Sequence, residues 1–346
     1  MAFRYSDKYK KYSLDMHVNV TRDEFLKQFD PEALAKDIIS TGAEAGMMYI
    51  QSHYGYSYWP TKVGEMHPGL IGNEDAFKRL YDEMHKGGMD VDVYFSMIYN
   101  NWAYDHHPEW RIKDIDGNYS RDKGRRFGLC CPNSEGYKKF CRDQIADFTE
   151  YVGPYEAFFA DMTFWPTVCY CDNCRARWEK EVGGEMPRIV NWKDERWKLF
   201  QRKREEWLQD YMQYIYDSVK MVNPGAVVEM QNSTMPASWM MGVTENATIA
   251  SDAVSGDLYG GFSQQTFACK MYYNMTPNLP FNYTTSRCEP SLDEHTTIKS
   301  EVMMKLHAML SFINHGSNIF VDAVDMTGTY EPLVYSRLKN VYDDAG

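Results

Sequence analysis

The chain has 346 residues, of which 44% are hydrophobic and 25% charged, which is enough apolar material for one large folded domain. Its formal net charge of −12 opposes binding to nucleic acid and to anionic membranes, and favours neutral or cationic ligands. No stretch approaches the roughly 18 apolar residues of a membrane span, and the opening MAFRYSDKYKKYSLD lacks the apolar core of a signal peptide. We therefore expect a cytoplasmic protein with no nucleic acid or membrane partner.

Short apolar runs alternate with amphipathic segments along the chain, a pattern typical of parallel β/α architecture. The predicted strands are 12–18, 46–52, 90–96, 155–161, 226–232, 248–254, 279–285 and 318–324. The predicted helices are 31–43, 74–88, 135–152, 197–222, 298–316 and 331–346. Eight such strands predict an α/β fold, a (β/α)8 TIM barrel that forms a single domain over residues 1–346, with a cysteine-rich insertion around 165–190.

Carboxylates at the predicted strand ends carry the functional hypothesis, because active sites of this fold lie at the carboxyl ends of the strands. A retaining glycosidase needs one carboxylate as nucleophile and a second as acid/base. Asp161 ends the fourth predicted strand among aromatic residues and is the expected nucleophile, with a helix N-cap as the alternative role. Asp257, in SGDLYGG after the sixth strand, is the first acid/base candidate. Glu229, inside the fifth strand, is the second, and either one can instead be structural.

Sugar-binding side chains are expected from the same strand ends and loops. Aromatic rings stack on the apolar face of a pyranose, while imidazole and amide groups bind its hydroxyls. The candidates are His17, His53, Tyr94, Trp165, Asn232 and His295. A core ring or a satisfied structural histidine is the alternative at each position.

Three cysteines stand close together as C-Y-C-D-N-C, at Cys169, Cys171 and Cys174. In a cytosolic chain this spacing suits thiolates around one zinc ion better than disulfides. Cys131, in FGLCCPN, is the preferred fourth ligand. A closed site of four thiolates leaves no open position for catalysis, so any zinc is expected to be structural, and reduced thiols without metal are the alternative.

Several segments resemble the family 29 α-L-fucosidases. Ser52-His53-Tyr54-Gly55-Tyr56 with Trp59 is similar to the His-rich turn and tryptophan of those enzymes, and Tyr94-Phe95-Ser96 to a strand end of theirs. YEAFFADMTFW is similar to their fourth-strand motif, whose Asp is the nucleophile, and LDMHV places His17 where they have a sugar-binding His. LCCPN, CYCDNC, DEHTTIKSE and VDAVDMTGTYEP look like a related bacterial group that includes family 151. The resemblance implies a sugar-binding role for Trp59.

The resemblance implies a retaining exo-glycoside hydrolase, an α-L-fucosidase acting by double displacement on an oligosaccharide or glycoside, with no cofactor for catalysis. The cysteine pattern also resembles the family 42 β-galactosidases, but those have Asn-Glu where this chain has Ala160-Asp161. A β-galactosidase-like enzyme is therefore the runner-up, and a non-catalytic carbohydrate-binding barrel is the alternative of a different class. A homo-oligomer is possible.

Overall fold

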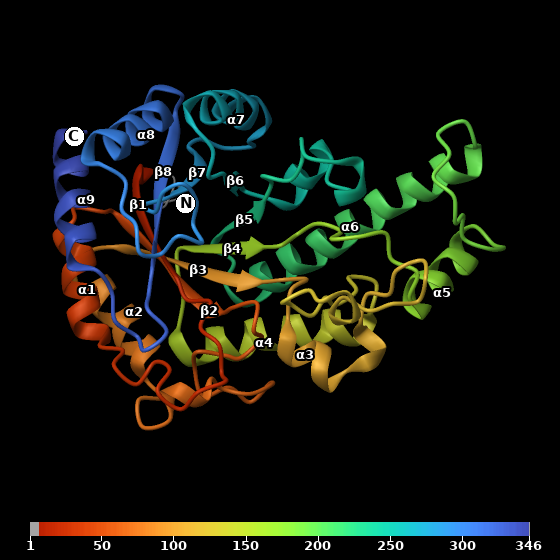
Figure 1. Cartoon of the computed structure of the whole chain (residues 1–346), viewed down its shortest axis with the longest axis horizontal. Helices are drawn as coiled ribbons and strands as arrows, with labels where there is room; N and C mark the ends of the chain where they lie inside the picture. Colours follow the sequence, from red (N-terminus) through yellow and green to blue (C-terminus); the bar gives the residue numbers. More distant parts are fainter. Residues whose placement is uncertain (1–6, 346) are drawn as a thin grey trace.

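A computed structural model describes residues 7–345 of the chain as a closed barrel of parallel strands in the order β1 to β8, with β1 paired to β8. The helices surround the strands (Figure 1). The predicted TIM barrel is therefore confirmed, while residues 1–6 and 346 of the predicted single domain lie outside the described part. No helix among residues 7–345 is both long and apolar enough to cross a membrane.

The strands of the barrel are β1 Lys10–Asp15, β2 Ala45–Gln51, β3 Asp90–Ser96, β4 Ala157–Asp161, β5 Val227–Gln231, β6 Ala253–Asp257, β7 Phe281–Ser286 and β8 Gly316–Ala323. The α-helices are α1 Pro31–Ser40, α2 Ala76–Lys86, α3 Asn101–His106, α4 Glu135–Val152, α5 Asp172–Glu181, α6 Glu195–Val222, α7 Phe262–Met275, α8 Glu301–Ile313 and α9 Pro332–Asp344.

Local sequence explains where helices begin and end. Asp30 caps α1 by accepting a hydrogen bond from the backbone N–H of Ala33, and Ser134 caps α4 in the same way. Gly153 follows α4 with a φ of 91°, a left-handed conformation that favours glycine and turns the chain toward β4. Asp30 and Ser134 thus fix the first residues of α1 and α4, and Gly153 fixes the end of α4.

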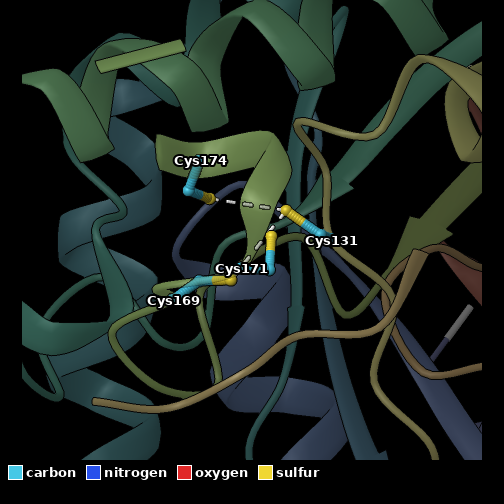
Figure 2. A group of neighbouring side chains, drawn as sticks. All are labelled: Cys131, Cys169, Cys171 and Cys174. Atoms are coloured by element: carbon cyan, nitrogen blue, oxygen red, sulfur yellow. Dashed lines mark hydrogen bonds between the residues drawn. The ribbon is translucent and has the colours of Figure 1, made fainter. Parts of the chain in front are cut away.

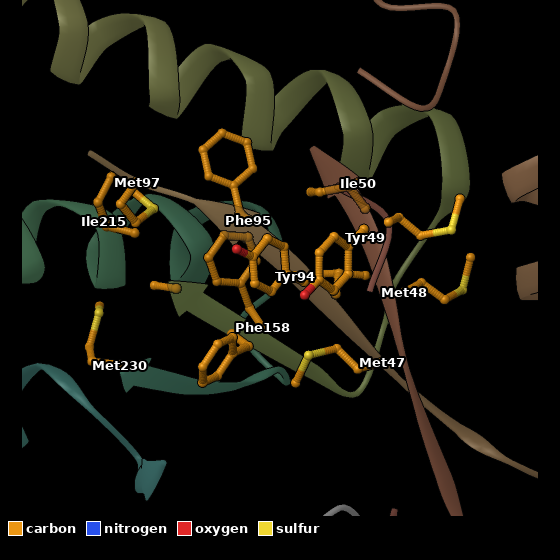
Figure 3. Packing of buried hydrophobic residues seen from close by; sticks show 14 of the residues in the cluster. Met47, Met48, Tyr49, Ile50, Tyr94, Phe95, Met97, Phe158, Ile215 and Met230 are labelled. Atoms are coloured by element: carbon orange, nitrogen blue, oxygen red, sulfur yellow. The ribbon is translucent and has the colours of Figure 1, made fainter. Parts of the chain in front are cut away.

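Side chains of β2 and β3 alternate between the barrel interior and the helical layer (Figure 3). Met47 and Tyr49 of β2 line the interior cavity described below, whereas Met48 and Ile50 lie in the buried core around them. In β3, Phe95 packs in the same hydrophobic core as residues of α4 and α6. The strands are therefore buried on both faces, and this is why they read as continuous apolar runs.

One expected strand is displaced, and three helices, α3, α5 and α7, were not expected. The sixth strand spans Ala253–Asp257 and not 248–254, because Glu245–Ala250 forms a 3-10 helix. Asp257 therefore ends a strand and does not lie in the loop after it. The sequence of α7, FSQQTFACKMYYNM, has apolar residues on its exposed side too, such as Phe267, which is 60% exposed. It therefore lacks the clear amphipathic pattern by which the other helices were recognised.

Candidate active site

A cavity of about 550 Å³ opens at the carboxyl ends of the strands. This is the end of the barrel at which the sequence placed the chemistry. The predicted site residues that line the cavity are His17, His53, Tyr94, Asp161, Asp257 and His295. They come from the ends of six strands or the loops that follow, so the barrel brings together side chains that are far apart in sequence.

Asp161 is the last residue of β4 and is only 6% exposed. Its Oδ2 accepts a hydrogen bond from the hydroxyl of Tyr94 and lies 4.0 Å from Nε2 of His53. Burial, and then the charge of Asp257, raise the pKa of Asp161 to about 7, although the bond from Tyr94 opposes this. Asp161 and Asp257 are therefore electrostatically coupled across one cavity.

Asp257 ends β6 and has a more polar environment than Asp161. Its Oδ1 accepts hydrogen bonds from Nε2 of Gln231 at 2.7 Å and from the hydroxyl of Ser233 at 3.3 Å. Its Oδ2 accepts one from the hydroxyl of Tyr259 at 2.8 Å. Three donors fix the plane of the carboxyl group, so its position in the cavity is well defined.

His53 follows β2 and has a defined tautomer. The hydroxyl of Ser96 donates to the carbonyl of Tyr99 at 2.8 Å, so the contact of 2.7 Å between Ser96 and Nδ1 of His53 requires the imidazole to donate. Burial and the charges of His17 and Arg126 hold the pKa of His53 well below its usual range. The neutral ring therefore turns an unprotonated Nε2 toward Asp161, where it can accept a hydrogen bond from a sugar hydroxyl.

One wall of the cavity consists of stacked rings from the first three strands. Tyr49 and Tyr94 stack with centroids 3.7 Å apart at an angle of 4°, and the ring of His17 lies 3.9 Å from that of His53. Phe127 packs edge-on against His53 at 5.0 Å. These contacts hold the two histidines in a rigid wall.

Arg126 and Phe127 line the cavity but were not among the predicted residues. They belong to the long segment between α3 and α4. This segment does not follow a barrel strand directly, so the rule that site residues lie at strand ends did not single it out. The guanidinium of Arg126 donates to the hydroxyl of Tyr54 and lies 4.9 Å from the centre of the Phe127 ring. The only signal in the sequence was the basic and aromatic run RRF itself.

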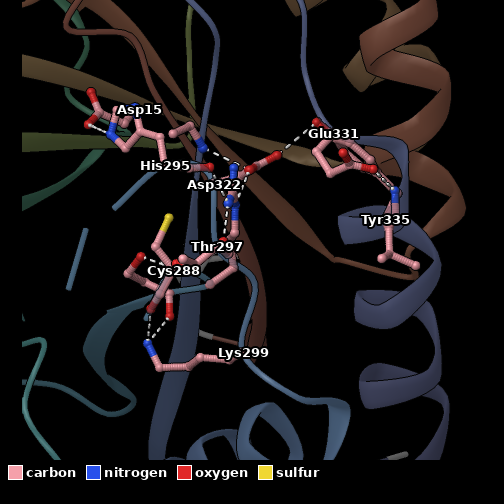
Figure 4. Close-up of polar contacts among 12 residues, drawn as sticks. Asp15, Cys288, His295, Thr297, Lys299, Asp322, Glu331 and Tyr335 are labelled. Atoms are coloured by element: carbon pink, nitrogen blue, oxygen red, sulfur yellow. Dashed lines mark hydrogen bonds and ion pairs between the residues drawn. The ribbon is translucent and has the colours of Figure 1, made fainter. Parts of the chain in front are cut away.

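The loop from Cys288 to Lys299 forms the opposite wall and carries His295 (Figure 4). Arg287 fixes it by donating to the backbone carbonyls of His295, at 2.7 Å, and Thr297, while its Nε bonds to Asp322 at 2.7 Å. Lys299 donates to the carbonyls of Ser286 and Cys288. Arg287 and Lys299 thus hold a wall of the site through its backbone.

Neither of the two predicted tryptophans lines the cavity. Trp59 is 1% exposed and donates to Asp147 of α4 at 2.8 Å. Trp165 is also 1% exposed and donates to the carbonyl of Arg204 in α6 at 2.8 Å. Their rings are closed off by helices, so the structure offers no face of either for a sugar.

The two polar candidates of β5 also lie outside the cavity lining. Glu229 is fully buried. Burial lowers the pKa of Lys11 to about 8, and the negative charge of Glu229 is the largest of the charges that oppose this shift. Asn232 is fully buried and donates to the carbonyl of Met230. Instead Gln231, which shares an alternation phase with Glu229, reaches Asp257. Of the three predicted catalytic carboxylates, Asp161 and Asp257 line the cavity and Glu229 does not.

The predicted cysteine cluster is present, because the sulfurs of Cys131, Cys169, Cys171 and Cys174 lie within 4.8 Å of one another and all four residues are buried (Figure 2). Sγ of Cys131 is 3.5 Å from that of Cys174 and 4.0 Å from that of Cys169. The amide of Asn133 donates to Sγ of Cys174 at 3.3 Å. Four converging sulfurs with such a donor can hold a metal ion.

A closed (β/α)8 barrel with a polar cavity at the carboxyl ends of its strands is a common enzyme architecture. A family model for α-L-fucosidases matches residues 3–251, and the chain belongs to this family of glycoside hydrolases. No curated protein has a significant sequence match to the chain.

Solved structures share the barrel at low identity. The α-L-fucosidase isoenzyme 2 from Paenibacillus thiaminolyticus is 15% identical, with a TM-score of 0.80 over 98% of this chain and 49% of its own. A β-galactosidase from Halorubrum lacusprofundi is 14% identical, with a TM-score of 0.69 over 97% and 57% of the two chains. A GH29 α-L-fucosidase from Bacteroides thetaiotaomicron is 12% identical, with a TM-score of 0.57 over 92% and 60%. The chain thus spans about half the length of the Paenibacillus enzyme, and these similarities show the fold alone.

Proposed function

We propose that this protein is a retaining exo-acting α-L-fucosidase with Asp161 as nucleophile and Asp257 as acid/base. The observation that carries the proposal is the pair of coupled carboxyl groups at the ends of β4 and β6, facing one cavity. Burial and the charge of Asp257 raise the pKa of Asp161 to about 7, so Asp161 is ionised and able to attack above that pH. A retaining glycosidase needs one ionised and one protonated carboxyl group at the start of its cycle.

The reaction proceeds in two displacements. An oxygen of ionised Asp161 attacks the anomeric carbon, the bond to the leaving oxygen breaks, and protonated Asp257 gives that oxygen its proton. Asp257, now a carboxylate, takes a proton from water. The water oxygen attacks the same carbon, releases Asp161 as a carboxylate and completes hydrolysis with retained configuration.

The hydrogen bonds of the pair support this division of roles. The hydroxyl of Tyr94 donates to Asp161 and stabilises it as an anion, in keeping with a nucleophile. The resemblance of the β4 segment to the fourth-strand motif of the family 29 α-L-fucosidases supports the same assignment. Around Asp257, the donors Gln231, Ser233 and Tyr259 stabilise the carboxylate that forms once the proton has left.

The sugar is proposed to lie between the two walls, with a hydroxyl donating to Nε2 of His53. His17 and Tyr94 lie beside that position, and the stacked ring of Tyr49 closes the floor. Hydrolysis of 4-nitrophenyl α-L-fucopyranoside tests the proposal, with the Asp161→Asn variant as control for contaminating activity. Absence of hydrolysis by the wild-type protein at pH 5 to 8 would contradict it.

A β-galactosidase-like activity is the second candidate, and the cysteine cluster is the observation that favours it, since the pattern resembles family 42. The 4-nitrophenyl β-D-galactopyranoside therefore belongs in the same assay. A higher kcat/KM on the galactoside than on the fucoside would replace the first proposal by the second.

We further propose that the cysteine cluster holds one structural zinc ion. Zinc–sulfur bonds of about 2.3 Å in a tetrahedron place the sulfurs about 3.8 Å apart, near the 3.5 and 4.0 Å found here. Elemental analysis of protein purified without chelator should give about one zinc per chain. The Cys269→Ala variant, which changes a buried cysteine outside the cluster, should keep this zinc, and a wild-type protein without metal would contradict the proposal.

We also propose that the protein works in the cytoplasm, where thiols remain reduced. All cysteines of the described chain are free and buried, and zinc requires thiolates rather than disulfides. Fractionation of the source cells tests this, and enzyme recovered mainly outside the cytoplasm would contradict it.

A further inference from the structure

We propose that Asp15 is a positioning residue that fixes two histidines of the cavity, His17 at the end of β1 and His295 in the loop after β7. Its consequence for turnover rests on the proposed glycosidase function, but its effect on the histidine rings does not. The function proposed above gives no role to Asp15.

Asp15 ends β1, is 6% exposed and lines the cavity. Its Oδ1 accepts a hydrogen bond from the backbone N–H of His17 at 2.9 Å and is in contact with Nδ1 of the same residue. Its Oδ2 lies 3.8 Å from Nε2 of His295 (Figure 4). One buried carboxylate therefore serves two imidazoles that come from opposite ends of the barrel sequence.

The contact at Nδ1 determines the tautomer of His17. A carboxylate only accepts, so Nδ1 must carry the proton. Nε2 is then directed toward the hydroxyl of Tyr94, 3.5 Å away. The hydroxyl of Tyr94 donates its single proton to Asp161. Nε2 of His17 can therefore bond to Tyr94 only as a donor, which requires the imidazolium form.

Asp15 thus begins a chain of contacts that runs through His17 and Tyr94 to Asp161. Burial opposes ionisation of Asp15, yet the neighbouring His17 and His295 lower its pKa, so it remains a carboxylate. A protonated His17 in turn favours the ionised form of Asp161. The rings of Tyr49, His53, Tyr94 and Phe127 face His17 from the other sides and bring no further carboxylate.

The alternative is that Asp15 only stabilises the loop. That loop is held independently by Arg287, which donates to the carbonyls of His295 and Thr297. Loss of Asp15 should therefore leave the loop backbone in place and release the two imidazole rings. This difference makes a positioning role separable from a structural one.

A double-mutant cycle tests whether Asp15 acts through His17. Asp15→Ala and His17→Ala should each lower kcat/KM by about 10- to 100-fold, and Asp15→Ala should have a smaller effect, through His295 alone, when His17 is already replaced. Asp147→Asn is the matched control, because it alters a buried carboxylate outside the cavity, and its effect should be additive with His17→Ala. Additive losses for Asp15 and His17 would overturn the proposal.

Imidazole nitrogen shifts measured by NMR give a readout that does not depend on activity. With His17 assigned by comparison with His17→Gln, the wild-type ring should have a protonated Nδ1, and Asp15→Ala should shift the proton toward Nε2. If Asp15→Ala does not fold, Asp15→Leu keeps the size but removes the acceptor, and should shift the proton toward Nε2 in the same way. An unchanged His17 spectrum in either variant would overturn the proposal. Lack of wild-type activity on any glycoside would instead contradict the proposed function and leave this measurement intact.

Discussion

The cavity and the cysteine cluster place their polar atoms in opposite ways. In the cavity, carboxyl groups and imidazoles turn toward about 550 Å³ of open space, and a neighbouring group such as Asp257 raises the pKa of Asp161. In the cluster, four buried sulfurs turn toward one another within 4.8 Å and leave no space for a substrate. The first arrangement suits chemistry on a ligand, and the second suits cross-linking of distant segments. Changes in the cavity should therefore alter turnover, and changes in the cluster should alter stability.

The largest effect is expected for Asp161→Gly, which removes the proposed nucleophile. Turnover of natural substrates should fall by on the order of 10⁴-fold or more, because no covalent intermediate can form. Thermal unfolding should change little, since the replaced carboxyl group has an unfavourable buried environment in the wild type. Near-normal activity of a folded Asp161→Gly protein would remove the assignment.

Product stereochemistry separates the two members of the carboxyl pair. With an activated substrate, azide should attack the sugar directly in Asp161→Gly and yield a glycosyl azide of inverted configuration. In Asp257→Gly the nucleophile survives, so azide should give a product of retained configuration. The same comparison in Glu229→Gly should show no azide product, because Glu229 does not line the cavity. Exchanged stereochemistry between the first two variants would exchange their roles.

The pH dependence should be the next largest effect. Asp161 must be ionised to act as nucleophile, and burial together with the charge of Asp257 raises its pKa to about 7. The value of kcat/KM should therefore fall by about tenfold for each pH unit below 7, where Asp161 becomes protonated. A profile measured from pH 5 to 9 that stays flat below 7 would show that ionisation of Asp161 does not govern turnover.

Replacement of His53 should have a smaller effect on turnover. His53→Ala removes an acceptor for a sugar hydroxyl, and kcat/KM should fall by about 10- to 100-fold, more than kcat itself. His307→Gln is a suitable control, because His307 is buried between α7 and α8, where it bonds to Gln265. Similar losses in the two variants would mean that His53 is only structural.

The cysteine cluster should show the reverse behaviour. Cys171→Ser should lower the zinc content and reduce the melting temperature by several degrees, because metal binding is coupled to folding of the linked segments. Activity of the remaining folded protein at low temperature should stay close to that of the wild type. A strong loss of turnover with an unchanged melting temperature would show that the cluster contributes to the active site.

The smallest effect on turnover is expected for Trp59→Phe. The change removes one hydrogen bond to Asp147, which keeps bonds from Thr61 and from the backbone of Lys62. We expect a loss of about 1 to 2 kcal/mol in the free energy of unfolding and little change in kcat/KM. A large rise in KM would instead revive the sugar-binding role that the sequence suggested for this ring.

The sequence by itself determined the barrel, the nucleophile candidate and the cysteine cluster. Eight apolar runs separated by amphipathic helices specify β/α units, since each strand must be buried on both faces. Asp161 at the end of such a run and the C-x-C-x-x-C spacing involve residues close together in sequence. They can therefore be recognised without knowledge of the tertiary structure. Strand ends also placed His17 and His53 correctly beside the cavity.

Only the tertiary structure decided which of the remaining polar and aromatic residues reach the cavity. Alternation along β5 directs Gln231 to Asp257 and turns Asn232 away, and a shift of one residue in phase cannot be read from a short run. Trp59 and Trp165 lie in polar loops by sequence, but α4 and α6 cover them in the fold. Arg126 and the anchoring of the last loop by Arg287 depend on segments distant in sequence, so no local pattern records them.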